Sequence, residues 1–150
     1  MLKWIDIPPL WLLLCAALAW VQATHFAFGL SFGGSWAEFA GGLLVGGGLV
    51  LMALAFAEFR RHRTTVIPHM DAERLISSGI FKRSRNPIYL GDVLILAGLI
   101  LRWDAVLALP LVPIFVWVIE KRFILDEENR LRKKFRADFA RYCQKARRWI

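Results

Sequence analysis

The chain has 150 residues, of which 57% are hydrophobic and 21% are charged, and its formal net charge is +8. This apolar composition argues against an ordinary soluble enzyme and favours a single integral membrane domain. The excess of Lys and Arg would suit a nucleic-acid partner on a soluble chain, but it also suits a membrane protein that faces anionic lipid.

Two long apolar segments occupy the first part of the chain. Residues 10–30 and residues 36–57 are each long enough as a helix to cross a hydrocarbon core about 30 Å thick, so we predict two membrane spans. The first segment also resembles a signal peptide, but Asp6 and the proline pair before it indicate that it is retained. A polar segment, residues 60–86, follows and is predicted to be a loop.

Two shorter apolar segments, residues 87–101 and residues 105–119, come next and are separated by Arg102-Trp103-Asp104. Each would be only about 22 Å long as a helix, so we predict a helical hairpin whose spans lengthen at their basic ends. If four segments cross the membrane, 19 of the 20 Lys and Arg residues fall on one side, and Arg102 is the exception. The positive-inside rule places that side in the cytoplasm.

The predicted architecture is therefore all-α, with four transmembrane helices and both termini in the cytoplasm. We expect the bacterial inner membrane as its location and no nucleic-acid partner. The tail, residues 120–150, carries apolar side chains every three or four residues: Leu131, Phe135, Phe139, Tyr142, Ala146 and Trp149. This stripe predicts a C-terminal amphipathic helix, which could lie on the bilayer or cover the polar loop.

Cysteine and histidine are too few and too scattered for a metal site. Cys15 and Cys143 lie in different settings and form no CxxC pair. The three histidines have no HExxH spacing and no cysteine nearby, so we predict neither a disulfide framework nor a metal.

Two polar clusters lie on the predicted cytoplasmic side, at residues 77–91 and residues 126–130. Because they flank the two ends of a hairpin, they must be neighbours in space. A guanidinium and carboxylates then converge at the membrane surface, where they could bind a zwitterionic ligand. The alternative is that these charges only pair with each other.

The first cluster carries the pattern Ser78-Gly79-x-Phe81-x-x-Ser84-Arg85-Asn86-Pro87-x-Tyr89-Leu90-Gly91, and the second carries Glu127-Glu128. With a hydrophobic hairpin between them, they resemble the membrane S-adenosylmethionine-dependent methyltransferases, which include isoprenylcysteine carboxyl methyltransferases and phospholipid N-methyltransferases. The resemblance covers about residues 61–150. It implies S-adenosylmethionine as cofactor and methyl transfer to a lipid or lipophilic small molecule at the cytoplasmic face.

The resemblance also implies roles for single residues. Arg85 would hold the cofactor carboxylate, Tyr89 its sulfonium or adenine, and the Glu127-Glu128 pair its ribose or ammonium. Other residues implied in cofactor binding are Gly79, Asn86, Pro87, Gly46 and Gly48. Asn86 stands where the isoprenylcysteine branch usually has His, which argues against prenylcysteine as substrate.

Each of these residues also has a structural alternative. Arg85 could contact lipid phosphate, Tyr89 could be an interfacial anchor, and the glycines could serve helix packing. The two glutamates could pair with Arg130 or Arg132.

Two residues are candidates for proton transfer or substrate orientation. Asp92 lies inside the third predicted span, where a carboxylate needs a partner or a polar cavity, and pairing with an arginine is its alternative. His69 lies in the loop before the motif, where it could equally be exposed. The rival hypothesis to an enzyme is a noncatalytic membrane scaffold or lipid-binding module, which predicts no cofactor affinity.

Overall fold

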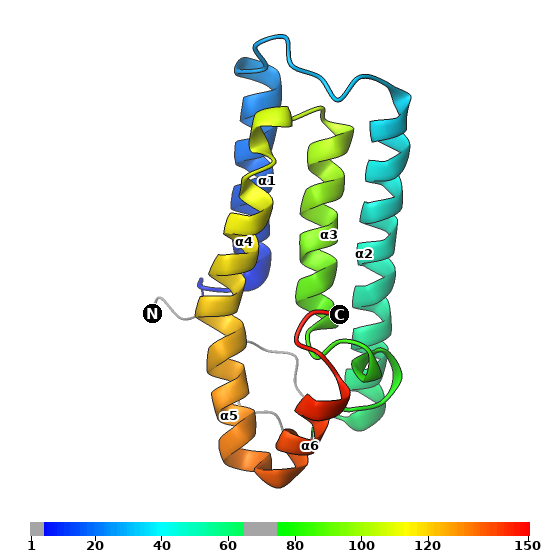
Figure 1. The fold of residues 1–150 in the computed structure, drawn as a ribbon, viewed down its shortest axis with the longest axis vertical. Coiled ribbons are helices and arrows are strands. Elements are labelled where there is room, and N and C mark those ends of the chain that lie inside the picture. The colour runs from blue at the N-terminus through cyan, green and yellow to red at the C-terminus, as the bar shows by residue number, and fades with distance from the viewer. Residues whose placement is uncertain (1–4, 65–74) are drawn as a thin grey trace.

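The computed structural model describes residues 5–64 and 75–150, and every regular element among them is helical (Figure 1). The elements in chain order are α1 (Pro8–His25), α2 (Ser35–His62), the 3-10 turn η2 (Gly79–Lys82), α3 (Pro87–Arg102), the 3-10 turn η3 (Val106–Ala108), α4 (Leu111–Ile119), the π-helical turn η4 (Glu120–Ile124), α5 (Leu125–Phe135) and α6 (Ala137–Lys145). The all-α prediction is confirmed.

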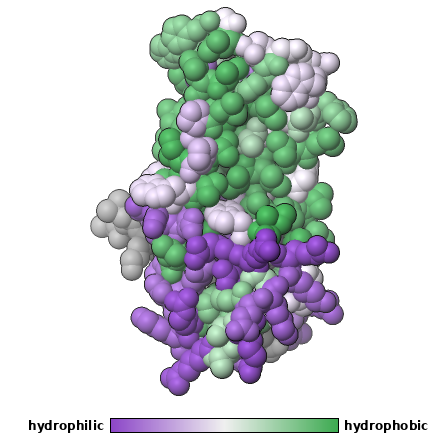
Figure 2. All heavy atoms as spheres, in the orientation of Figure 1, coloured by the Kyte–Doolittle hydropathy of each residue, from purple (hydrophilic) through white to green (hydrophobic). Residues whose placement is uncertain are grey.

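Hydrophobic and hydrophilic side chains separate along the long axis of the molecule. Apolar side chains cover the upper part of Figure 2, over α1 to α4, and hydrophilic ones cover the lower part. We call the lower part, made of α5, α6 and residues 75–86, the polar end. Among the described helices, α2 alone is long and apolar enough, by length and composition, to cross a membrane.

Helix α3 is central, since it contacts α1, α2 and α4. Its closest neighbour is α2, which it meets at two pairs of glycines. A Cβ atom added to Gly41 would lie 2.5 Å from the carbonyl oxygen of Gly98, and one added to Gly48 would lie 2.6 Å from that of Gly91. The two antiparallel backbones therefore touch where neither has a side chain.

The two glycines of α2 predicted to bind cofactor lie in different surroundings. Gly48 is buried against α3, so the structure gives it a packing role. Gly46 is exposed, and a Cβ atom added there would meet nothing within 4 Å. For both, contact with the cofactor stays a prediction.

The predicted hairpin is present, but its second arm is not one regular helix. Helix α3 begins at Pro87 and ends at Arg102, close to the predicted bounds. The predicted helix over residues 105–119 is divided into η3 and α4, and α4 begins only after Pro110. Pro110 is the N-cap residue of α4, and it has no N–H that could continue a helix from the preceding turn.

The prediction of a single amphipathic tail helix is wrong. The chain breaks at Arg136, whose φ of 43° lies in the left-handed region, and α6 ends at Lys145. The break lets α6 turn back over residues 75–84, where Phe139 and Tyr142 pack in one cluster with Phe81. The tail thus covers the polar loop, which was one of the two predicted arrangements.

The contact between α2 and α3 can be tested by adding one methyl group. Gly48→Ala places a Cβ against backbone, so the helices must shift, and we expect a loss of about 1–3 kcal/mol of unfolding free energy. Gly46→Ala adds the same group in open space and should leave stability equal or slightly higher. Thermal unfolding in detergent compares the two. A Gly48→Ala protein as stable as wild type would contradict the packing role.

Candidate active site

Residues 84–86, which we call the motif segment, directly precede α3. They are held by the C-terminal end of the chain. The backbone N–H of Arg85 donates to the carbonyl of Arg147 over 2.9 Å, and the Nδ2 of Asn86 donates to the carbonyl of Arg148, also over 2.9 Å. The Oγ of the buried Ser84 accepts from the N–H of Asn86. These bonds fix the backbone from which the Arg85 side chain extends.

A cluster of four charges lies beside this segment. Glu128 of α5 is only 8% exposed, and Arg148 donates from Nε to its Oε1 over 2.8 Å and from Nη2 to its Oε2 over 3.0 Å. The Nη1 of Arg148 also pairs with Glu120. Arg85 is more distant, with its Nη2 3.5 Å from Glu128 Oε1. The predicted convergence of a guanidinium and carboxylates is therefore present.

Arg148 and Glu120 belong to this cluster but were missed by the sequence reasoning. Arg148 follows Arg147 in a basic tail, and nothing in the sequence distinguishes the two. In the structure Arg147 is exposed, whereas Arg148 makes a two-pronged contact with Glu128. Those hydrogen bonds raise the pKa of Arg148 above its ordinary value.

The two adjacent glutamates face different partners, as expected for neighbours about 100° apart on a helix. Glu127 accepts a hydrogen bond from the hydroxyl of Tyr89, and Glu128 faces the two arginines. Tyr89 is itself 8% exposed. The acidic pair thus joins α5 to both the motif segment and the first turn of α3.

Two polar atoms near the cluster are buried and have no hydrogen-bond partner among the described residues. They are the Nε of Arg85 and the Oδ2 of Asp92. Asp92 is 2% exposed and lies one helical turn after Tyr89, next to the contact of Gly91 with Gly48. Buried polar groups are nearly always paired, so an open donor and an open acceptor indicate a site that is completed by a ligand.

The other predicted residues are less directly involved. Pro87 is buried at the start of α3. Gly79 has a φ of 59°, and a Cβ atom there would lie 2.5 Å from Oε1 of Glu58. The conformation of the turn and the close approach of Glu58 therefore account for a glycine at this position. Gly46 is on an exposed face of α2, and His69 lies outside the described residues.

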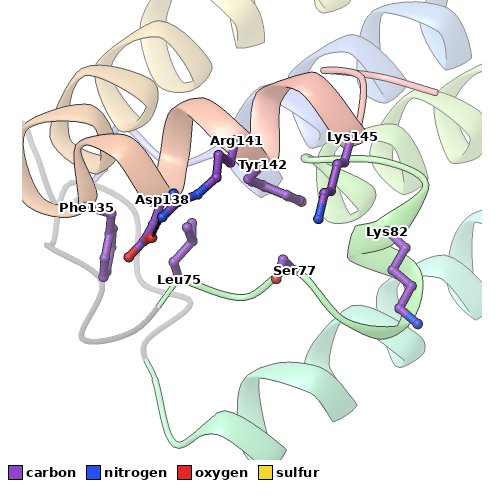
Figure 3. A pocket seen from close by; sticks show the side chains of 8 residues that line it. All are labelled: Leu75, Ser77, Lys82, Phe135, Asp138, Arg141, Tyr142 and Lys145. Atoms are coloured by element: carbon purple, nitrogen blue, oxygen red, sulfur yellow. Dashed lines mark hydrogen bonds and ion pairs between the residues drawn. The ribbon is translucent and has the colours of Figure 1, made fainter.

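A cavity of about 770 Å³ lies between α6 and residues 75–82 (Figure 3). None of the predicted site residues lines it; its walls are Leu75, Ser77, Lys82, Phe135, Asp138, Arg141, Tyr142 and Lys145. Asp138 and Arg141 form an ion pair there with both side chains 68% exposed. Arg85 and Asp92, which each have a buried polar atom without a partner among the described residues, do not line this cavity, so the candidate active site is the cluster around Arg85.

Comparison with known families identifies the family of the chain. The model of the phospholipid methyltransferase family matches residues 36–138, which is more than half of the chain. The chain belongs to the phospholipid methyltransferase family. No curated protein and no solved structure gave a match.

Membership of the phospholipid methyltransferase family means that the protein is a membrane-family enzyme that uses S-adenosylmethionine and methylates a lipid. The residues present fit this cofactor. The unpartnered Nε of Arg85 is a donor suited to a carboxylate, and the acidic pair suits an ammonium or ribose hydroxyls. The matched region ends at residue 138, so Arg148 lies beyond it.

The charge cluster predicts unequal effects of neutralising the two glutamates. Glu128→Gln leaves the partly buried guanidinium groups of Arg85 and Arg148 with only Glu120 for compensation, so we expect a loss of about 1–3 kcal/mol of unfolding free energy. Glu127→Gln keeps an acceptor for Tyr89 and should cost less.

Asp138→Asn is the matched control, because its ion pair is exposed and such pairs contribute only about 0–1 kcal/mol. Melting temperatures of the three variants in detergent give the comparison. Equal, small losses at positions 128 and 138 would show that Glu128 is not the anchor of the cluster.

Proposed function

We propose that the protein binds S-adenosylmethionine at Arg85 and methylates a lipid at the cytoplasmic face of the membrane. The observation that carries the proposal is the buried Nε of Arg85, which has no acceptor among the described residues and lies beside a carboxylate already held by Arg148. Arg85 would bind the cofactor carboxylate, and Glu127 and Glu128 would face its ammonium or ribose. The cofactor supplies an activated methyl group when bound.

We also propose that four segments cross the membrane, namely α1, α3 and α4 in addition to α2. Large apolar side chains are exposed on three of these helices, for example Leu13 at 65%, Phe39 at 71% and Trp117 at 61%. Such surfaces are stable against lipid and costly in water. At 1.5 Å per residue, α1 and α3 are about 27 Å and 24 Å long, which a slightly thinned bilayer accommodates.

The position of the site suits a reaction between a lipid and a water-soluble cofactor. The charge cluster joins Glu128 of α5 to Arg85 and Arg148, whereas Asp92 lies within the second turn of α3. A lipid head group can therefore approach from the bilayer while S-adenosylmethionine arrives from the aqueous side.

Asp92 is the residue that we propose for the acceptor. Its Oδ2 has no hydrogen-bond partner among the residues that the structure describes, so we propose that it orients a head group. Where the acceptor is an amine, its nitrogen would form a bond to the methyl carbon as the methyl–sulfur bond of the cofactor breaks and S-adenosylhomocysteine leaves. The nitrogen would also lose a proton, which Asp92 would accept. His69 is the second candidate for this proton.

The cofactor site is tested by calorimetry with S-adenosylmethionine on detergent-purified protein. Arg85→Ala removes a charge-assisted contact and should cost on the order of 2–4 kcal/mol of binding, or roughly 30-fold to 1000-fold in Kd. Arg85→Lys should restore little, because an ammonium lacks the fork of donors. Arg141→Ala removes an exposed arginine and serves as control. Unchanged affinity in both Arg85 variants would overturn the assignment.

The role of Asp92 is separable from cofactor binding. Asp92→Asn keeps the size of the side chain but removes its basicity, so methyl transfer to the lipid acceptor should fall about 100-fold or more. Affinity for S-adenosylmethionine should stay within about twofold, because the cofactor contacts lie at Arg85. Full turnover by Asp92→Asn would rule out proton acceptance at this position.

The topology is tested by cysteine accessibility in a background without Cys15 and Cys143. A cysteine at position 144, exposed on α6, should be protected from an impermeant reagent added outside intact cells. A cysteine at position 35, exposed at the start of α2, should react. The reverse pattern would place the charge cluster on the outer face.

A further inference from the structure

We propose that Arg148 is a positioning residue that keeps Arg85 free to bind the cofactor carboxylate. This inference rests on the proposed cofactor site and extends it to a part of the chain beyond the family match, which ends at residue 138. Nothing in the motif pattern points to Arg148, and its role follows only from its contacts.

Arg148 satisfies Glu128 more completely than Arg85 does. Both carboxylate oxygens of Glu128 accept from Arg148, over 2.8 Å and 3.0 Å. The only contact of Arg85 with the same group is 3.5 Å long, and its Nε has no partner among the residues that the structure describes. Glu128 is therefore neutralised by the tail, and most of the donor capacity of Arg85 stays available.

The tail is held firmly enough to do this. Ala146 is 3% exposed, and Trp149 packs against the hydrophobic core formed by α3 and α4. Between them, the carbonyls of Arg147 and Arg148 accept hydrogen bonds from Arg85 and Asn86. On its far side, the Arg148 guanidinium pairs with Glu120, so each of its three nitrogens has a carboxylate partner.

The balance of charge explains why removing Arg148 would affect Arg85. Two arginines now face two glutamates. Without Arg148, the buried Glu128 must take Arg85 as its cation, because an unpaired carboxylate in this setting is costly. Arg85 is then committed to Glu128, and an incoming cofactor carboxylate meets two acidic groups with no free donor. The loss is confined to the amino-acid half of the cofactor.

Two ligands separate this role from a general structural one. S-adenosylhomocysteine carries the amino-acid half, whereas 5′-methylthioadenosine lacks it. We expect Arg148→Ala to raise the dissociation constant of S-adenosylhomocysteine by about tenfold or more and to leave that of 5′-methylthioadenosine within about twofold. Both are measured by competition against labelled S-adenosylmethionine on full-length protein in detergent.

Three further variants complete the design. Arg148→Lys keeps the charge but cannot contact both carboxylates, so its loss for S-adenosylhomocysteine should be intermediate. Arg148→Gln retains a polar side chain of similar volume and replaces Arg148→Ala if that variant does not fold. The same two dissociation constants are then compared. Arg141→Ala removes an arginine from the same tail that pairs only with an exposed acid, and it should bind both ligands as wild type does.

Each other result overturns the inference. Equal weakening for both ligands would make Arg148 a general structural residue, and unchanged binding would make it dispensable. Tighter binding of S-adenosylhomocysteine would show that the tail blocks the site. If the wild-type protein binds neither ligand nor S-adenosylmethionine, the proposed cofactor site itself is wrong, and that outcome is distinct from the other three.

Discussion

A carboxylate that is buried at the edge of an apolar helix bundle must be paired, and Glu128 meets this constraint by joining three distant parts of the chain. It is held by Arg148 from the tail and contacted by Arg85 from the motif segment, while it belongs itself to α5. Removing two charges from water is costly, and only good hydrogen-bond geometry offsets that cost. The arrangement therefore tolerates little displacement of any partner, so the tail, the motif and α5 have to assemble together.

The glycine contact between α2 and α3 fixes the position of α3, and with it the position of Asp92. Because backbone meets backbone at Gly48 and Gly91, α3 has little freedom to slide along or rotate against α2. Asp92 follows Gly91 directly, so its direction is set by the same contact. The glycines thereby hold the proposed acceptor side of the site, and the ion cluster holds the proposed cofactor side.

Much of this arrangement could be predicted from the sequence because it follows from local rules. Apolar length and a proline at position 87 gave the start of α3, and the hairpin brought Arg85 to Glu128. The break at Arg136 could not be predicted, since a stripe with spacings of three and four continues through it unchanged. Gly46 and Gly48 lie about 200° apart around the axis of α2, and only the packing of α3 shows which one faces inward.

Arg85 and Asp92, which each have a buried polar atom without a partner among the described residues, lie on either side of the start of α3. Arg85 precedes α3 by two residues, and Asp92 lies within its second turn, so the start of one helix connects them. A charged cofactor is best held where its counter-ions are still partly hydrated, whereas a lipid head group arrives from the bilayer. Methyl transfer requires the two reactants in line at contact distance. The proposed residues for the two reactants lie on and just before a single helix, which begins at the polar end and continues into the apolar bundle.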